Sequence, residues 1–409
     1  MKETNAIYRG LRYLKNNGVK ATLHRMRSGP ILEPQKIDVL GFYQFVMEDT
    51  PIPLDKEAYE KKKDADTKVL NWIIPEMSPG SGGHINIFRF ISNLEEMGMH
   101  SRIYLYRATN FSDNQSLRAF LKQYFSILDQ RVEVYCDVKY AEFAHATIAT
   151  SWITAYFVKN YNNTISKFYF VQDYEPYFYA LGSEYQMAEE TYRLGFRGLT
   201  AGGWLEKKLA DEFGMKTRGF GFSYDRELYK PGKKRDKRPR IFFYARPVTP
   251  RRDFEIGLLA LNTVCQKRPE VEVVFAGWDV SNYQIPFQHK NLGVVALENL
   301  SDLYAQCDLC LVISNTNLSL LPLEIMASNS VAVCSKGENS TWLVNENNSI
   351  LVDYEPISMA KTMLYYLDHP QELEVIRKNG LEYVSKTSWK QEAEIVYHAI
   401  LEGIQEDEK

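Results

Sequence analysis

The sequence has little cysteine and no long apolar run near its start. It holds five cysteines in 409 residues, at positions 136, 265, 307, 310 and 334. This number is low and odd, so no disulfide framework is predicted and a reducing compartment is favoured. No apolar stretch of about 18 residues opens the chain, so neither a signal peptide nor a spanning helix is expected there. We therefore predict a cytoplasmic protein.

The chain also lacks a strong excess of charge and any metal-binding pattern. The net charge of -3 argues against nucleic acid as a partner. The seven histidines show no zinc-site spacing.

Two short motifs that can bind metals are present but are interpreted as accidental or structural. Asp64 and Asp66 form a D-x-D in a lysine-rich helix predicted over residues 56–68, which we interpret as accidental. Cys307 and Cys310 enter a buried strand and are interpreted as core residues. We expect no metal and no cofactor.

The first 36 residues are strongly basic. They carry eight Lys or Arg against two Glu, a local charge of +6. Ile7, Leu11 and Leu14 fall near helical spacing, together with Tyr8 and Tyr13. This pattern favours a solvated helix that packs on the protein by one face. An amphipathic helix on an anionic membrane surface, at the inner face of the plasma membrane, is the alternative.

Two blocks of alternating strand and helix patterns follow this segment. The first begins with a strand over residues 68–74, a glycine-rich turn and a helix over 84–97. The second begins with a strand over 240–244, after a charged linker with two prolines at 230–240. Such alternation predicts parallel sheets that are covered on both faces. We expect an α/β protein with two Rossmann-like, doubly wound domains that face each other across a cleft. The predicted segments are a basic helical extension (1–66), the first domain (67–229), the second domain (230–386) and a final helix (387–409).

The strongest functional signal is a helix start within residues 314–327. Pro322 fits the first helical position, where its missing N–H costs nothing. The free backbone N–H groups around Leu321, together with the helix dipole, favour a diphosphate. Glu324 would repel that diphosphate unless it turned toward a hydroxyl of the nucleoside sugar. Acidic residues also favour helix starts without any such role.

Three arginines follow the first strand of the second block. Arg246 comes directly after it, and Arg251 and Arg252 lie in the same loop. Ligands of parallel sheets bind beyond the carboxyl ends of the strands, where guanidinium groups can neutralise a diphosphate. A solvated basic loop is the alternative.

Gly82 and Gly83, with Gly80, lie between a strand and its helix. Glycine lets the backbone approach a ligand closely. Ile85 stands where a dehydrogenase-type G-x-G-x-x-G motif has its third glycine, so a dinucleotide site is disfavoured. The loop is better suited to a phosphate or a sugar ring.

Asp173 and Glu175 follow an apolar strand that ends near residue 172. At this position they are candidates to bind sugar hydroxyls, and as a pair they could activate an acceptor as general base. A simple turn is an equally good interpretation.

The second block resembles the nucleotide domain of retaining GT-B glycosyltransferases. Tyr244-Ala245-Arg246 matches the family's strand followed by Gly-Arg, with Ala245 in place of glycine. Arg252 best occupies the position of the family's lysine, and residues 322–327 match its acidic helix start. Thr316 stands where the family has a first acidic residue, which suggests a deoxysugar donor. The whole chain is similar to bacterial rhamnosyltransferases that build cell-surface polysaccharides, such as S-layer glycans, from dTDP-rhamnose.

This resemblance implies a metal-independent hexosyltransferase that retains configuration. The first domain would face the acceptor, the second would bind the nucleotide sugar, and the final helix would cross back to the first. Arg246, Arg252 and amides near Leu321 would stabilise the leaving diphosphate. Asp173 lies near the family's contact to the transferred sugar. The donor-binding set is Gly82, Gly83, Arg246, Arg251, Arg252, Asn317, Leu321, Pro322 and Glu324.

The expected partners are a nucleoside diphosphate sugar and an oligo- or polysaccharide acceptor, with a lipid-linked acceptor as one version. Two other functions remain open at this stage. A nucleotide-sugar epimerase can share the architecture, and so can a non-catalytic protein that binds nucleotide sugars.

Overall fold

The computed structural model describes residues 36–408, and the chain divides into two compact units. The first unit ends at Met47 and contains the short helices α2 (Val39–Phe42) and α3 (Gln44–Met47). The second unit begins at Glu48 and holds all other described elements. Residues 1–35, which carry most of the basic segment, lie outside the described residues, so both interpretations of it remain predictions.

Residues 48–66, assigned above to the N-terminal extension, belong to the second unit. Ile52 N donates to Asn160 O at 2.7 Å. Helix α4 (Lys56–Lys62) follows, and a ring nitrogen of His145 lies 2.9 Å from Lys62 O. The helix is shorter than the predicted 56–68, and these contacts attach it to the first sheet domain.

The first domain is built on a seven-stranded sheet of order β3-β2-β1-β4-β5-β6-β7, and every described pairing in it is parallel. Its central strands are buried apolar runs, as a sheet covered on both faces requires. The strands are β1 (Val69–Pro75), β2 (His100–Tyr106), β3 (Glu133–Tyr135), β4 (Ala144–Ala149), β5 (Thr164–Val171), β6 (Arg197–Ala201) and β7 (Lys216–Phe220). The helices are α5 (Gly82–Glu96), α6 (Asn114–Tyr124), α7 (Trp152–Asn160), α8 (Ser183–Glu190) and α9 (Gly202–Phe213), with the short turns η1 (Val138–Tyr140), η2 (Glu175–Phe178) and η3 (Thr191–Arg193).

The second domain repeats this plan with a six-stranded sheet of order β10-β9-β8-β11-β12-β13, again parallel in every described pairing. Its strands are β8 (Arg240–Tyr244), β9 (Glu272–Ala276), β10 (His289–Asn291), β11 (Leu309–Val312), β12 (Val331–Ser335) and β13 (Ile350–Val352). Its helices are α10 (Phe254–Lys267), α11 (Leu297–Ala305), α12 (Leu321–Ala327), α13 (Glu338–Thr341), α14 (Pro356–Asp368) and α15 (Pro370–Ser385), with the turn η4 (Pro250–Arg252). The predicted fold class, two doubly wound α/β domains, is confirmed.

Strand order reverses beside the first strand of each sheet, between β1 and β4 and between β8 and β11. Doubly wound sheets bind ligands in the crevice outside the carboxyl ends of their strands at such a reversal. The loops after β1, β5, β8 and β11 contain the predicted site residues. The topology therefore brings together the glycine loop, Asp173, the arginines and the start of α12.

The chain crosses between the two domains twice, first between β7 and β8 (residues 221–239) and again between α15 and α16 (residues 386–388). The two crossings are hydrogen-bonded to each other. Ser223 Oγ on the first crossing lies 2.8 Å from Thr387 Oγ1 on the second. Arg226 Nη2 donates to Thr387 O at 2.7 Å. The two connections therefore run together.

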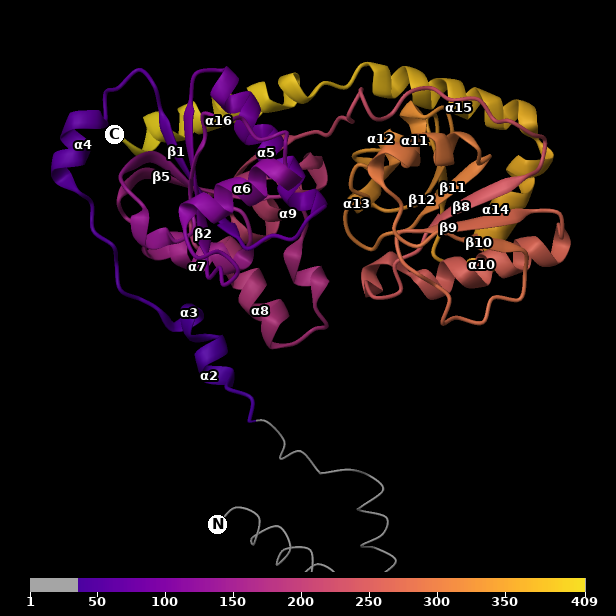
Figure 1. Cartoon of the computed structure of the whole chain (residues 1–409), viewed down its shortest axis with the longest axis horizontal. Helices are drawn as coiled ribbons and strands as arrows, with labels where there is room; N and C mark the ends of the chain where they lie inside the picture. Colours follow the sequence, from indigo (N-terminus) through magenta and orange to yellow (C-terminus); the bar gives the residue numbers. More distant parts are fainter. Residues whose placement is uncertain (1–35, 409) are drawn as a thin grey trace, which may run out of the picture. The chain divides into compact units, whose positions relative to one another are not determined.

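The second crossing leads into α16 (Trp389–Asp407), the yellow C-terminal helix of Figure 1. It packs on α5, β5 and β7 of the first domain. Gly403 lies so close to Phe168 that a Cβ there would be 2.5 Å from the phenyl ring. The last helix thus covers a sheet formed by the first half of the chain.

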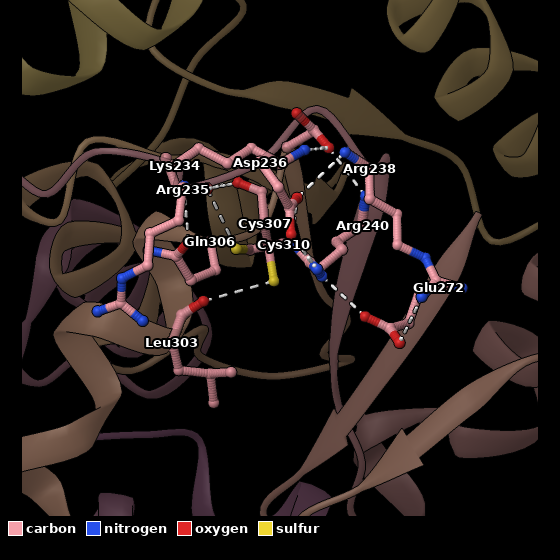
Figure 2. A network of polar contacts seen from close by, with 12 residues as sticks. Lys234, Arg235, Asp236, Arg238, Arg240, Glu272, Leu303, Gln306, Cys307 and Cys310 are labelled. Atoms are coloured by element: carbon pink, nitrogen blue, oxygen red, sulfur yellow. Dashed lines mark hydrogen bonds and ion pairs between the residues drawn. The ribbon is translucent and has the colours of Figure 1, made fainter. Parts of the chain in front are cut away.

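Ion pairs hold the end of the first crossing in place just before β8, as Figure 2 shows. Lys234 Nζ donates to Asp308 Oδ2 at 2.5 Å. Arg240 Nε donates to Glu272 Oε2 at 2.7 Å, and Arg238 Nη1 lies 3.3 Å from Glu272 Oε1. Glu272 is buried, so this carboxylate depends on its cations. Two core residues of the same network, Cys307 and Cys310, are buried as predicted.

Replacing Glu272 with glutamine should destabilise the fold by about 2–3 kcal/mol, because it leaves the half-buried Arg240 with weaker partners. Asp302→Asn removes an exposed partner of Arg235 and should cost about 0.5 kcal/mol or less. Urea unfolding of both variants measures the difference. Equal midpoints would show that the Glu272 network does not hold the linker.

Candidate functional site

Two adjoining cavities lie between the domains at the strand ends. Cavity 1 has a volume of about 460 Å³ and cavity 2 of about 360 Å³. Asn86 and Ser319 line both, so the cavities are neighbours. The predicted residues in cavity 1 are Gly80, Gly82, Arg246, Leu321 and Glu324, and those in cavity 2 are Gly83, Asp173, Glu175, Arg251, Arg252 and Asn317.

Glu324 lies in the first turn of α12 and lines cavity 1. Burial raises the pKa of Glu324 to about 7, although the Tyr229 hydroxyl and the Arg89 cation oppose this rise. Asp225, a second carboxylate on the same wall, adds to the rise. Near neutral pH Glu324 therefore changes between a carboxylate that accepts hydrogen bonds and a neutral acid.

Arg89 is a second feature of cavity 1, and the sequence analysis did not find it. It lies on α5, its guanidinium 4.7 Å from the Trp389 ring and 3.9 Å from Asp225 Oδ2. Within the described residues, its Nε has no hydrogen-bond partner. Burial lowers the pKa of Arg89, and the carboxylates of Asp225 and Glu324 oppose that effect. The arginine adds positive charge from the first domain to a cavity that already holds Arg246.

The sequence contains only a weak indication that Arg89 belongs to the site. It is the only cation in the apolar helix over residues 84–97 and follows the glycine loop by two helical turns. Tyr229 and Asp225 carried no such signal, because they lie in the crossing segment and reach cavity 1 only through the tertiary fold.

Arg246 follows β8 and lines cavity 1. Its Nη1 donates to Gly277 O at 3.3 Å, and its guanidinium lies 5.7 Å from the Trp278 ring. These contacts position the side chain at the end of the sheet. These two contacts leave the Arg246 guanidinium in the lining of cavity 1, where its charge can meet a ligand.

Arg251 and Arg252 line cavity 2 from the turn η4. Arg252 is only 9% exposed, and burial lowers its pKa while Tyr244 and Asp173 oppose this. Arg251 stacks over Phe178 at 4.2 Å. In the described part of the chain, Arg252 Nη1 and Arg251 Nε have no hydrogen-bond partner. Buried guanidinium groups with unused donors suit an anionic ligand.

Asp173 connects the two domains through its carboxylate. Thr316 Oγ1 donates to Asp173 Oδ2 at 2.8 Å, and Asn317 N donates to Oδ1 at 3.1 Å. Asn317 Nδ2 also donates to Gln172 O at 2.9 Å. Burial raises the pKa of Asp173, against the hydrogen bond from Thr316 and the charges of the two cavity 2 arginines. Thr316 occupies the position where an acid was expected and holds an acid from the other domain.

Glu175, the other carboxylate of the proposed base pair, is engaged by its own domain. Its Oε2 accepts from Trp152 N at 2.9 Å and its Oε1 accepts from Tyr169 OH at 2.7 Å. Burial raises the pKa of Glu175 to about 7. Both carboxylate oxygens of Glu175 thus accept hydrogen bonds from the first domain, whereas those of Asp173 accept from the second domain.

The glycine loop lies at the start of α5 and opens onto both cavities. A Cβ at Gly82 would meet no atom within 4 Å, so this glycine leaves open space toward cavity 1. Gly83 O accepts from Gln172 Nε2 at 3.1 Å. His84 follows, with Nδ1 2.7 Å from Ser81 Oγ, and burial lowers its pKa. Neutral His84 therefore supports the loop.

The start of α12 differs by one residue from the prediction. The helix begins at Leu321, so Pro322 is its second residue. Pro322 is buried and lines neither cavity, whereas Leu321 lines cavity 1. The preceding Ser319 has a φ of 61°, a left-handed conformation that turns the loop into the helix.

Across residues 36–408, no group of three or more His, Cys, Asp or Glu side chains is arranged to hold a metal ion. No helix in that same range is long and apolar enough to cross a membrane.

Removing the Thr316 hydroxyl should weaken the contact between the domains. Thr316→Val keeps the shape and should cost about 2 kcal/mol of unfolding free energy, because the lost bond goes to a half-buried, charged carboxylate. In an Asp173→Asn background the same change should cost clearly less. Urea unfolding of the double-mutant cycle tests this, with Thr263→Val as control, because the Thr263 hydroxyl donates only within its own helix, to Leu259 O. Equal costs in both backgrounds would contradict the pairing.

Comparisons with known proteins agree with this architecture. Residues 239–364 match a family model described as WsaF, C-terminal domain. Over 356 residues the chain is 30% identical to the O-antigen biosynthesis protein RfbC of Myxococcus xanthus. That match covers 82% of this chain and 27% of the relative, so the chain spans about a quarter of the relative's length.

Solved structures resemble about four fifths of the chain at low sequence identity. A mutant of S. aureus TarM in complex with fondaparinux, alpha-GlcNAc-glycerol and UDP has a TM-score of 0.64 at 9% identity, covering 82% of this chain and 100% of TarM. Anabaena HepE with UDP and glucose has a TM-score of 0.60 at 15% identity, covering 82% and 99%. At these identities the likeness concerns the fold. The chain therefore has the GT-B glycosyltransferase fold, and its second domain is similar to the C-terminal domain of WsaF.

Proposed function

We propose that this chain is a glycosyltransferase that moves a sugar from a nucleoside diphosphate donor to a saccharide hydroxyl during the synthesis of a surface polysaccharide. One observation carries the proposal. Two doubly wound domains enclose adjoining cavities that hold a glycine loop, the cations Arg89, Arg246, Arg251 and Arg252, and the carboxylate Glu324. The similarity to RfbC and to the WsaF domain supports a role in polysaccharide synthesis.

In this proposal the nucleoside lies in cavity 1 and the transferred sugar in cavity 2. Cavity 1 has apolar walls for a base and Glu324 for a hydroxyl of the nucleoside sugar. The diphosphate lies where the cavities meet, near Ser319 and Leu321, within reach of Arg246 and the η4 arginines. TarM and HepE were solved with UDP, which is consistent with a nucleoside diphosphate in this fold.

Departure of the diphosphate is the main electrostatic task of the reaction. The bond from the anomeric carbon to the diphosphate breaks, and negative charge develops on the leaving oxygen. Arg246, Arg251 and Arg252 meet that charge with donors that are already in position, which lowers the barrier more than flexible surface cations would. This set can serve as charge stabiliser without a divalent ion, so we propose a metal-independent reaction.

The transferred sugar is proposed to be rhamnose, from dTDP-rhamnose, with retention of configuration. The resemblance of the whole chain to rhamnosyltransferases supports this choice. Thr316 in place of an acid removes one carboxylate partner for sugar hydroxyls, which suits a deoxysugar. Asp173 remains as the carboxylate beside this sugar.

The acceptor is proposed to be an oligo- or polysaccharide, lipid-linked in one version. A cytoplasmic location and a membrane contact through residues 1–35 remain predictions.

Truncation of Arg246 or Glu324 should lower turnover. Arg246→Ala and Glu324→Ala should each reduce kcat/KM at least about tenfold, roughly 1.4 kcal/mol of transition-state stabilisation. Release of nucleoside diphosphate from a panel of nucleotide sugars, with a saccharide acceptor present, measures this. Arg235→Ala, an exposed arginine of the linker, is the matched control. Wild-type rates in both site variants would reject the assignment.

The same assay separates the two rival functions. Release of a sugar epimer without transfer would favour an epimerase. Tight nucleotide binding with no turnover of any donor would favour a binding protein.

Nucleotide affinity should rise with pH through the pKa of Glu324, about 7. The ionised carboxylate accepts a hydrogen bond from the free hydroxyl of the nucleoside sugar, so binding is favoured above this pKa and weakened as pH falls below it. Between pH 8 and pH 6 the Kd for dTDP should increase up to about tenfold, since the ionised fraction falls by about that factor. Calorimetry on the wild type and on Glu324→Gln tests this. A pH dependence that survives unchanged in the variant would exclude Glu324 as its source.

A further inference from the structure

A third cavity lies between the domains, and the proposed donor site leaves it unused. It has a volume of about 550 Å³. The first domain contributes Tyr177 and one face of α9, including Trp204, and the second contributes α13 and Trp342. We call this cavity the α9–α13 groove. Its lining combines three aromatic rings with lysine and carboxylate side chains.

Trp342 is fixed in the wall of this groove. Its Nε1 donates to Asn339 O at 3.0 Å, and its ring lies 5.3 Å from that of Phe222. Gly202 has a φ of +83°, and a Cβ there would lie 2.2 Å from the Trp342 indole. The indole therefore rests on the backbone where α9 begins, and only glycine permits that approach.

The charges of the groove argue against an anionic ligand. Lys207 Nζ donates to Asp211 at 2.7 Å, and Lys208 Nζ donates to Glu212 at 2.7 Å, so both cations are paired. Glu338 adds a third carboxylate. Carboxylates accept hydrogen bonds from hydroxyl groups, and flat aromatic faces pack on the apolar C–H faces of sugar rings. The lining thus suits a neutral polyhydroxylated ligand.

The groove adjoins cavity 2 along an aromatic wall. Tyr177 lines the groove, and its neighbour Phe178 lines cavity 2 beneath Arg251. Phe222 lines cavity 2 and contacts Trp342. A chain of sugar units in the groove would therefore have its end beside the cavity that contains Asp173.

We propose that the α9–α13 groove binds the acceptor saccharide, holding the sugar units that precede the one that receives the transferred sugar. This inference rests on the proposed glycosyltransferase function, with the donor in cavities 1 and 2. It assigns Trp204 and Trp342 as stacking surfaces, one from each domain. Acceptor binding then requires both domains, as donor binding does.

The test uses the full chain and two readouts. The probe is a set of neutral oligosaccharides of increasing length, released from the surface polysaccharide of the producing cell. Saturation-transfer NMR measures binding without turnover, and a transfer assay gives separate KM values for donor and acceptor. Trp204→Ala should raise the acceptor KM about tenfold and reduce the saturation signal, while donor KM and donor hydrolysis by water stay unchanged. Trp204→Phe should recover most of the affinity, because it keeps an aromatic face.

Glu338→Ala tests the opposite wall and should also raise the acceptor KM. Tyr140→Ala, an exposed tyrosine of the first domain outside the groove, is the control and should behave as wild type. Wild-type acceptor binding by a folded Trp204→Ala chain would overturn the proposal. Absence of turnover with every donor would reject the proposed function, and the NMR readout would still decide whether saccharides occupy the groove.

Discussion

The two domains depend on a half-buried carboxylate of the first domain that accepts hydrogen bonds from the second. Asp173 projects from the end of β5, and the second domain supplies two of its donors, Thr316 Oγ1 and Asn317 N. A buried charge without partners is strongly unfavourable. Separation of the domains must therefore hydrate Asp173 or protonate it. The same contact closes cavity 2, so stability of the closed form and assembly of the site have one physical origin.

Burial also removes the arginine side chains of the site from water before any ligand binds. Arg89, Arg251 and Arg252 are largely removed from water, and each keeps a nitrogen without a described partner. These guanidinium groups lose most of their water when the protein folds, and not when the ligand binds. A diphosphate can therefore form strong hydrogen bonds with them without reorganising them. The nearby aromatic rings of Trp389, Phe178 and Tyr244 compensate part of that cost through cation–π contacts.

Sequence patterns identified residues that follow strand ends but not those that reach the site from elsewhere. Arg246, Arg251, Arg252 and Asp173 were predicted because parallel sheets bring the ends of their strands to one edge. Glu324 was predicted because it lies in the first turn of a helix that follows such a strand. Arg89 lies on a helix face, and Tyr229 on a crossing segment, so their position depends on how the domains pack. The role of Thr316 was also hidden, because its partner comes from 143 residues earlier in the chain. The groove around Trp204 and Trp342 needs both domains and left no local signature.

The two bonded crossings between the domains have a mechanical consequence. Ser223 and Arg226 tie the first connection to Thr387 on the second, so the pair behaves as a single hinge rather than as two independent tethers. Any motion between the domains must then move both connections together, because each is hydrogen-bonded to the other. All three cavities have walls from both domains, so such a motion would change the width of all three at once.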